Sequence, residues 1–337
     1  MKIFVYSSVF YPNVGGLETV ILNLAHEFVA HGHNVKLATQ TSTSEDDNFS
    51  FEVIRCPTIN QLLNLTHWCD ICFHGCISLK AIWPVLILRK PLVVTHQTWY
   101  LYPGSKLTWQ GALKNWVTRF AASNIAPSQA IAAELPVPVT VIPNSYQDDI
   151  FYEMPKVRRD QDLVFLGRLV SDKGADLLID SLALLKQKGL EPNLTIIGQG
   201  TEEPNLREQV KRLGIAEQVK FLGTQFGYPL AQILNTYKIM VVPSRWQEPF
   251  GIVALEGIAC GCVVVGSEQG GLKDAIGLCG VTFPNGSVEG LTQILADLLL
   301  HNTKLNLYRA SQETHLARHR KSSVAKTYLQ VLEGIIQ

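Results

Sequence analysis

The chain has no excess of charge of either sign and no long apolar run. Its 337 residues carry 29 Lys and Arg against 29 Asp and Glu, so the formal net charge is zero. This balance gives no indication of a nucleic-acid-binding protein, because such proteins present a basic surface. The longest apolar stretch, Ala81 to Leu88, is far shorter than the roughly 20 residues of a membrane span. We therefore expect a soluble protein that contacts a membrane at most from its surface.

Cysteine is sparse and odd in number. Seven cysteines in a chain long enough to form its own core do not indicate a disulfide framework, and Cys260, Cys262 and Cys279 stand among small apolar residues as buried thiols do. The segment from His67 to Cys76 holds three cysteines and two histidines, a spacing compatible with zinc. Four of its residues read as a strand, however, and no second pair of ligands follows. We expect a reduced, cytoplasmic protein without a metal site.

The sequence does contain a regular alternation of short β-rich runs and amphipathic segments of helix length. Without a repeat of 20 to 50 residues, this alternation predicts βα units and parallel sheets. Seven predicted strands come first: Lys2–Tyr6, Asn34–Thr39, Phe51–Arg55, Asp70–Phe73, Leu92–Thr95, Asn124–Ala126 and Val139–Ile142. Six follow a polar, charged stretch: Leu163–Leu166, Asn193–Ile197, Val219–Leu222, Ile239–Val242, Val263–Val265 and Val281–Phe283.

Two Rossmann-like domains are therefore expected. Their predicted bounds are 1–152 and 163–318, with a linker at 153–162 and a final helix within 319–337 that crosses back to the first domain. Only helices follow the last strand, predicted at Val288–Leu300, Thr303–His315 and Ser322–Ile336. Sheets of this class bind ligands at the carboxyl ends of their strands, so two facing domains would form a cleft there.

Several predicted strands are followed by residues suited to an anion. Gly15 and Gly16 come after the first strand and open a helix, where backbone N–H groups can approach a phosphate closely. Arg168 and Lys173 follow the first strand of the second domain, and two fixed cations at a sheet edge suit a diphosphate. Taken alone, an ordinary turn and two solvent-exposed cations explain these residues equally well.

Other strand ends give weaker signals. Gly198 and Gly200 look like part of a dinucleotide fingerprint, but Glu203 stands where the third glycine belongs, so nicotinamide binding is not expected. His96 ends a strand, where either a structural or a functional histidine would fit. The acidic pair Asp160 and Asp162 precedes its strand, at the edge away from the expected cleft, and is interpreted as a solvated linker.

Two glutamates flank an apolar run after the strand that ends at Pro243. Glu248 lies in the predicted loop, and Glu256 lies inside a helix predicted from Gly251 to Cys260. Paired carboxylates suggest acid and base catalysis. A helical path would separate them by about 12 Å, which exceeds the roughly 5 to 9.5 Å of a glycosidase pair. A hydrolase is therefore not the favoured interpretation.

Taken in order, these motifs resemble those of the family-4 retaining glycosyltransferases. The matching pieces are Gly15-Gly16, His96, Ala126-Pro127-Ser128, Val141-Ile142-Pro143-Asn144, Gly167-Arg168 with Lys173-Gly174, Gly198-Gln199-Gly200, and Glu248-Pro249-Phe250-Gly251 to Glu256. The resemblance covers nearly the whole chain. It implies the α/β architecture called GT-B, in which two facing Rossmann-like domains hold the donor cleft between them. The donor would be a nucleotide-diphosphate sugar, bound mainly by the second domain.

The resemblance also implies residue roles. Arg168 and Lys173 would hold the donor diphosphate, Glu248 would contact the transferred sugar, and Glu256 would accept hydrogen bonds from the ribose. The expected donor-binding set further includes Gly15, Gly16, Gly198 and Gly223, with the helix-start residues Phe250, Gly251, Ile252 and Val253. The expected catalytic residues are His96, Arg168, Lys173 and Glu248, with no metal and no separate nucleophile.

Two positions depart from the family pattern and affect the acceptor side. The family's Pro-Asn-Gly-Val is here Pro143-Asn144-Ser145-Tyr146, and Gln97 stands where an Asp often follows the pocket histidine. A loop of aromatic and basic residues, Trp99 to Arg119, fits either a membrane surface or a helix with a packed aromatic face.

The expected activity is hexosyl transfer with retention, without a metal, from UDP-glucose to a saccharide or a lipid-linked saccharide, in polysaccharide or exopolysaccharide biosynthesis. We expect a cytoplasmic enzyme at the inner face of the membrane, with no nucleic-acid partner. The alternatives are a nucleotide-sugar 2-epimerase of the same fold and a nucleotide-sugar-binding module without turnover.

Overall fold

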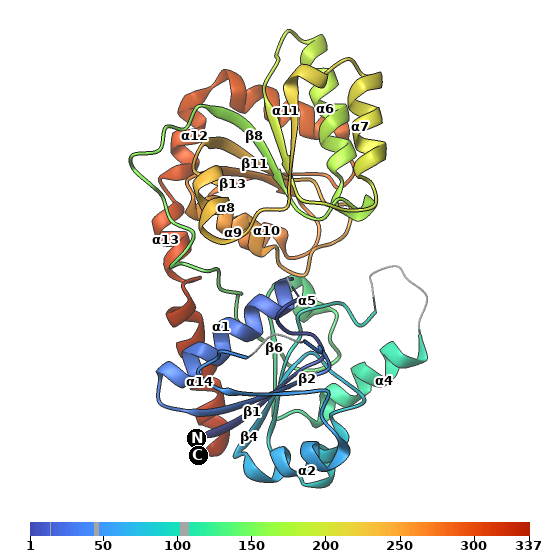
Figure 1. The fold of residues 1–337 in the computed structure, drawn as a ribbon, viewed down its shortest axis with the longest axis vertical. Coiled ribbons are helices and arrows are strands. Elements are labelled where there is room, and N and C mark those ends of the chain that lie inside the picture. Colours follow the sequence, from blue (N-terminus) through green and yellow to red (C-terminus); the bar gives the residue numbers. More distant parts are fainter. Residues whose placement is uncertain (14, 44–46, 102–107) are drawn as a thin grey trace. The chain divides into compact units, whose positions relative to one another are not determined.

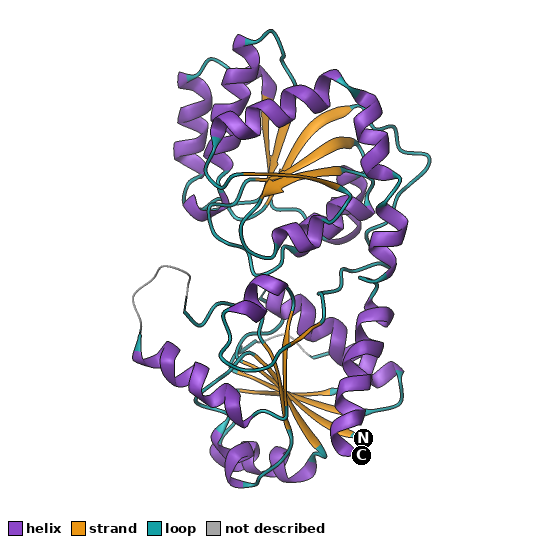
Figure 2. Cartoon of the chain, turned by 180° about the vertical axis from the view of Figure 1, so that it is seen from behind, coloured by secondary structure: helices purple, strands orange, loops and turns teal. Residues whose placement is uncertain are grey.

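The computed structural model describes residues 1–13, 15–43, 47–101 and 108–337. The chain divides into two compact units, which we call the first unit (Met1–Ser145 with Arg320–Gln337) and the second unit (Tyr146–His319). Each is built on its own parallel sheet with helices on both faces, as the orange strands and purple helices of Figure 2 show. Among the described residues, no helix has the length and apolar character needed to span a membrane.

The sheet of the first unit has seven strands in the order β3-β2-β1-β4-β5-β6-β7. The strands are β1 (Lys2–Ser7), β2 (Asn34–Thr39), β3 (Glu52–Arg55), β4 (Ile71–Gly75), β5 (Leu92–Thr95), β6 (Ser123–Ala126) and β7 (Thr140–Val141). The helices are α1 (Gly16–Ala30), α2 (Ile59–Trp68), α3 (Trp83–Ile87), α4 (Trp109–Val117), the 3₁₀ turn η1 (Thr118–Phe120), α5 (Gln129–Ala133) and α14 (Lys321–Ile336).

The sheet of the second unit has six strands in the order β10-β9-β8-β11-β12-β13. The strands are β8 (Gln161–Leu166), β9 (Leu194–Ile197), β10 (Val219–Gly223), β11 (Tyr237–Val242), β12 (Val263–Ser267) and β13 (Gly280–Phe283). The 3₁₀ turns are η2 (Ser171–Lys173) and η3 (Ala216–Gln218). The helices are α6 (Ala175–Gln187), α7 (Glu203–Arg212), α8 (Gly227–Leu234), α9 (Ile252–Ala259), α10 (Leu272–Ile276), α11 (Val288–Leu300), α12 (Asn302–Arg309) and α13 (Gln312–Ala317).

The local sequence explains these elements. Strands β1 and β12 are continuous apolar runs because helices cover both faces of each parallel sheet. Helix α1 buries Val20, Leu24 and Phe28, which are four residues apart and therefore lie on one face. All thirteen predicted strands are confirmed, with ends within two residues of those observed. The fold class predicted from the sequence, a pair of doubly wound sheets, is likewise confirmed.

Two predictions about elements were wrong. The helix expected over 303–315 is two helices, α12 and α13, because Arg309 donates to the carbonyl of Gly261 and Gln312 to that of Cys262, which anchors the chain on both sides of the break. Asp162 is not a solvated linker residue. It belongs to β8, and its carboxylate accepts hydrogen bonds from Lys238 (2.7 Å) and from the Asn193 side chain (3.0 Å).

The last helix, α14, packs in the first unit alongside α1, where Figure 1 shows the red and blue ribbons side by side. Tyr328 of α14 is fully buried, with its ring 5.8 Å from that of Phe73. Its hydroxyl lies 2.9 Å from that of Thr95 at the end of β5. The end of the chain thereby completes the core of the first unit.

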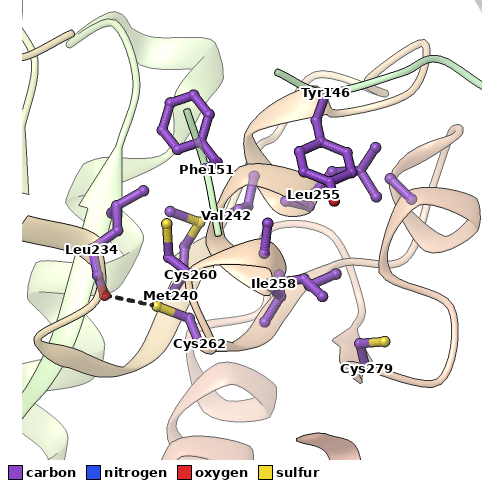
Figure 3. Close-up of a cluster of buried hydrophobic side chains, with 14 of the residues drawn as sticks. Tyr146, Phe151, Leu234, Met240, Val242, Leu255, Ile258, Cys260, Cys262 and Cys279 are labelled. Carbon is purple, nitrogen blue, oxygen red and sulfur yellow. Dashed lines mark hydrogen bonds between the residues drawn. The ribbon is translucent and has the colours of Figure 1, made fainter. Parts of the chain in front are cut away.

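A buried apolar cluster supports α9 in the second unit (Figure 3). It joins Leu255 and Ile258 of α9 to Met240 of β11 and to Phe151. The thiol of Cys262 donates to the carbonyl of Leu234 (3.3 Å), and burial raises the pKa of that thiol to about 11. The helix is thus held against the sheet by packing and not by charge.

His74, in β4, is a fully buried polar residue whose two ring nitrogens have no hydrogen-bond partner in the described part of the chain. Its ring packs against those of Tyr6 (5.2 Å) and Phe4 (6.4 Å). Burial lowers the pKa of His74 to about 3, so the ring stays neutral.

We expect His74→Leu to raise the free energy of unfolding by about 1 kcal/mol at pH 8, because the variant buries no unpaired polar group. The unfolded histidine gains a proton near pH 6.5 and the folded one only near pH 3. Acid therefore destabilises the wild type between these values by about 1.4 kcal/mol per pH unit. Urea denaturation should show the advantage of the variant growing by about 2 kcal/mol between pH 8 and pH 5. A constant difference would contradict this account.

Candidate functional site

The loops at the carboxyl edge of the second sheet carry most of the residues singled out from the sequence. Because the strands are parallel, the loops that follow β8, β9, β10 and β11 all leave the same edge. They hold Arg168 and Lys173, then Gly198, then Gly223, and then Glu248. The expected donor-binding residues of the second unit therefore come from neighbouring loops of one unit.

Backbone contacts fix these loops against each other. The N–H of Gly198 donates to the carbonyl of Gly223 (2.8 Å), and that of Leu169 donates to Gln199 (2.9 Å). Gly198 has a φ of +137°, and a Cβ there would collide with the carbonyl oxygen of Gly167. Gly200 approaches the carbonyl of Leu169 in the same way. Both glycines are therefore explained by the close approach of two loops, which sets the path of the loop that carries Arg168.

Lys173 and Glu248 form an ion pair across two of these loops. The ammonium of Lys173 lies 2.5 Å from Oε1 of Glu248, which also accepts a hydrogen bond from the hydroxyl of Ser244 (2.8 Å). Both side chains are mostly buried, with 22% and 12% exposed. The side chain of Arg168 is exposed and forms no hydrogen bond or ion pair within the described residues. The edge thus presents one neutralised cation and one that is available to an anion.

The loop before α6 is locked to the loop after β11. The carbonyl of Asp172 accepts from the backbone N–H groups of Arg245 (2.8 Å) and Trp246 (3.1 Å). Gly174 has a φ of +68°, and a Cβ there would collide with the carbonyl of Pro243. Neither Asp172 nor Ser244 was a candidate from the sequence, since a main-chain acceptor and a lone serine leave no pattern.

Helix α9 begins at this edge with a glycine. Gly251 has φ +104° and ψ 61°, and a Cβ there would lie 2.6 Å from Cδ1 of Leu272. Phe250 is 2% exposed, and its side chain belongs to the buried apolar cluster beneath α9. No side chain caps the helix, which leaves the N–H groups of its first turn, at Ile252 and Val253, oriented for an anion.

Glu256 lies in the second turn of α9 and is partly buried. Its carboxyl group forms no hydrogen bond or ion pair with the described residues. Burial raises the pKa of Glu256 to about 7, so the group is close to its titration midpoint at neutral pH. A carboxyl group without a protein partner is suited to accept hydrogen bonds from a ligand.

Three predicted site residues belong to the first unit. Gly15 is the N-cap of α1, with an extended backbone (φ −173°), and Gly16 is its first helical residue. A Cβ on Gly15 would lie 2.5 Å from the flexible carboxylate of Glu18. Glycine is therefore favoured there because it avoids this contact, and not because the backbone is strained.

His96 is fully buried, which the sequence did not indicate. Its Nδ1 lies 2.8 Å from the hydroxyl of Tyr100 and its Nε2 lies 3.0 Å from Oδ1 of Asn124. Burial lowers the pKa of His96 to about 4. A substrate could contact either nitrogen only if one of these hydrogen bonds opened, so the geometry favours a structural role, and the catalytic role of His96 stays a prediction.

The two departures from the family pattern, Gln97 and Ser145, both form buried hydrogen bonds, Gln97 with the neighbouring Asn144 and Ser145 with Asn23. The side chain of Asn144 donates to Oε1 of Gln97 (2.7 Å), and Gln97 donates to the hydroxyl of Thr95 (2.8 Å). Ser145 accepts from the side chain of Asn23 (3.3 Å). A glutamine in place of the usual acid thus completes a buried chain of neutral hydrogen bonds. Two loops of the first unit, Gln40 to Ser50 and Trp99 to Trp116, are expected from the sequence to contact the acceptor, and their residues 44–46 and 102–107, which include Tyr102 and Lys106, lie outside the described residues.

An open hollow of about 380 Å³ adjoins the Lys173 loop but is lined by none of the predicted donor-binding residues. Its walls include Ser171, Asp172 and Asp176, and the guanidinium of Arg245 is already paired with Asp176 at 2.6 Å. We do not assign the donor to it. Within the described ranges, no three His, Cys, Asp or Glu side chains are grouped as metal ligands.

The fold and this edge define a glycosyltransferase of GT-B type. Residues 147–314 match the glycosyl transferases group 1, and residues 14–149 match glycosyltransferase family 4. The chain belongs to this family.

Several proteins of this class are similar to the chain. A phosphatidyl-myo-inositol mannosyltransferase of Mycobacterium leprae is 27% identical over 76% of the chain and 70% of its own length. A D-inositol 3-phosphate glycosyltransferase of Jonesia denitrificans is 38% identical over 34% of the chain, a match that spans only 28% of that protein. The structure of Anabaena HepE in complex with UDP-glucose superposes with a TM-score of 0.81 and 21% identity, covering 99% of this chain and 100% of that one.

We expect Glu256→Gln to stabilise the free protein at alkaline pH. The unfolded carboxyl loses its proton near pH 4.5 and the folded one near pH 7, so the wild type loses stability as the pH rises through this window. The cost is complete above pH 7 and amounts to about 3 kcal/mol, which the glutamine does not incur. Urea denaturation should find the variant more stable by about 3 kcal/mol at pH 8 and by about 1 kcal/mol at pH 5. Equal gains at both values would point to packing instead.

We expect Gly198→Ala to cost more stability than Gly189→Ala. Gly189, at φ +77°, has no atom within 4 Å of its added Cβ, so it reports the backbone strain alone, about 1 kcal/mol. At Gly198 the added Cβ also collides with the carbonyl of Gly167. We therefore expect Gly198→Ala to lower the free energy of unfolding by more than about 2 kcal/mol, as measured by thermal unfolding. Equal losses would show that the two loops can separate without cost.

Proposed function

We propose that the chain is a retaining hexosyltransferase that uses UDP-glucose, bound by the second unit, and acts without a metal ion. The observation that carries the proposal is the exposed, unpaired Arg168 at the same sheet edge as the Lys173–Glu248 pair. A diphosphate carries charge that one free guanidinium and the uncapped start of α9 can meet.

The Lys173–Glu248 pair has capacity left for a donor. An ammonium group has three hydrogen-bond donors, and one is used by Glu248. The carboxylate of Glu248 has about four lone-pair sites, of which Lys173 and Ser244 occupy two. Lys173 can therefore contact a phosphate, and Glu248 the hydroxyl groups of a hexose, while the pair stays intact.

In the proposed reaction the bond between the anomeric carbon and the phosphate oxygen breaks while the acceptor oxygen bonds to the same face of the sugar. The leaving phosphate takes the proton of the acceptor hydroxyl. Negative charge grows on that phosphate, so Arg168, Lys173 and the first amides of α9 stabilise the transition state more than the bound donor. The pKa of Glu256 is about 7, so the group can ionise at neutral pH. As a carboxylate it would accept hydrogen bonds from the ribose hydroxyl groups.

The choice of substrates follows from similar proteins. Anabaena HepE, whose fold the chain shares, is described in complex with UDP and with UDP-glucose, which supports a UDP-glucose donor. The name of the Mycobacterium leprae relative includes phosphatidyl-myo-inositol, which supports a lipid-linked acceptor. We propose a saccharide or lipid-linked saccharide acceptor, as in polysaccharide biosynthesis at the cytoplasmic side of a membrane.

The test is to incubate the purified chain with UDP-, GDP- and ADP-glucose labelled in the sugar, with a chelator present, alone and with candidate acceptors. We expect glucosylated product, or slow release of glucose, from UDP-glucose. A parallel incubation with UDP-N-acetylglucosamine tests the alternative, since its conversion to the 2-epimer would assign an epimerase. Saturable binding without turnover would assign a binding module, and loss of activity with the chelator would refute the metal-free mechanism.

In the same assay, Arg168→Ala and Lys173→Ala should each lower kcat by about 10²- to 10³-fold, because each removes charge stabilisation from the leaving phosphate. Matched controls are Arg158→Ala, whose side chain is 89% exposed, and the exposed Lys188→Ala. Both controls should keep the wild-type kcat. Full turnover in either Arg168→Ala or Lys173→Ala would contradict the proposed site.

A further inference from the structure

Helix α4 and the turn η1 direct their largest apolar side chains to solvent. Trp109 is 71% exposed, Leu113 37%, Trp116 52% and Phe120 50%. These residues are spaced four, three and four apart, so they lie on one helical face. We call these four residues the aromatic stripe.

The inner face of the same helix has only small side chains, and one of them, Val117, packs in the apolar cluster of the first unit. Gly111, Val117 and Thr118 are the buried positions, and Gly111 abuts the backbone of Tyr100. The ring of Trp116 packs on that of Phe120, at 4.7 Å between centroids. The sequence left open whether these aromatic side chains pack into the protein or face solvent. In the structure the side chains of the aromatic stripe face solvent. An exposed apolar face of this kind marks an interaction surface.

The charge around the stripe is mainly basic, although the exposed Glu134 lines a small pocket together with Asn115 of α4. The sequence from Ile71 to Ala133 contains no Asp or Glu and six Lys and Arg. Helix α2 has no acidic residue either. Helices α2, α3 and α4 cover the same face of the sheet, since all three contribute to one buried cluster with Phe4 and Tyr6. Lys80, Arg89 and Arg119 are exposed in this region.

We propose that this face of the first unit docks on an anionic phospholipid surface. The aromatic stripe would enter the boundary between headgroups and acyl chains, where Trp is favoured, and Arg119 and Arg89 would meet lipid phosphates. Ile87 at the end of α3 and Ile59 at the start of α2, 67% and 64% exposed, add apolar area to the same helical layer.

The charge pattern distinguishes this occupant from a second copy of the chain. A symmetric dimer through the stripe would place one basic layer against another, and like charges across an interface cost affinity. Anionic lipid supplies both an apolar interior and opposite charge. The inference does not depend on the proposed function, because vesicles without any sugar acceptor test it.

The experiment is flotation of the full chain with vesicles of phosphatidylcholine alone or with about 30 mol% phosphatidylglycerol. We expect binding to the anionic vesicles at least about tenfold stronger than to neutral ones, and weaker binding as salt rises. Equal binding to both, or none to either, would overturn the proposal.

Variants test the surface itself. The double variant Trp109→Ser with Trp116→Ser should weaken binding at least about tenfold, and Arg119→Gln about fivefold. Matched controls in the second unit are Leu307→Ser, at a side chain 72% exposed, and Arg158→Gln, and both should bind like the wild type. Wild-type binding by the double variant would overturn the proposal.

Two further measurements separate the remaining explanations. Phospholipids with brominated acyl chains should quench tryptophan fluorescence of the wild type, and the conservative variant Trp109→Phe with Trp116→Phe should lose that quenching. This readout does not require the serine variant to fold. Sedimentation showing a wild-type dimer that the serine variant cannot form would assign the stripe to a second copy and overturn lipid docking.

Discussion

Close contact between the backbones of strand-end loops is the constraint on which the candidate chemistry of the second unit depends. At Gly198, Gly200 and Gly174 a second loop lies where a side chain would begin, so peptide groups of neighbouring loops touch directly. These backbone contacts hold the loop that carries Arg168 and Lys173, together with the Lys173–Glu248 ion pair and the hydrogen bond from Arg245 to the carbonyl of Ser171. The guanidinium of Arg168 is then available to a ligand, and the apolar cluster beneath α9 supports the helix at the same edge.

The charged groups at this edge differ in exposure, in ion pairing and, for Glu256, in pKa. Arg168 is exposed and unpaired among the described residues, Lys173 is neutralised by Glu248, and desolvation moves the pKa of Glu256 to about 7. An anion therefore meets an available guanidinium first. A carboxyl without a protein partner costs stability, and proteins retain such groups where a ligand compensates for it. The proposed donor provides that compensation through its hydroxyl groups.

The first unit has a different distribution of polar groups. Three polar side chains lie at the carboxyl edge of its sheet: His96, Gln97 and Asn144. Each is hydrogen-bonded to an uncharged partner in the core, so none of the three places a charge at this edge. Its outer helical layer is basic and apolar, and α4 is more apolar outside than inside. The proposed roles, donor binding by the second unit and lipid docking by the first, follow this difference in polar and apolar groups.

The sequence by itself determined the two parallel sheets, their strands and the loops where charged residues gather. These features follow from the alternation of apolar and amphipathic segments, which each segment carries locally, and from the common edge that parallel strands share. Only the tertiary structure decided the break between α12 and α13, the enclosure of His96, the pKa of Glu256 and the outward face of α4. Each of these depends on neighbours distant in the sequence: carbonyls that anchor a helix, hydroxyls that enclose a ring, a cluster that removes water, and the side of a helix that meets the sheet.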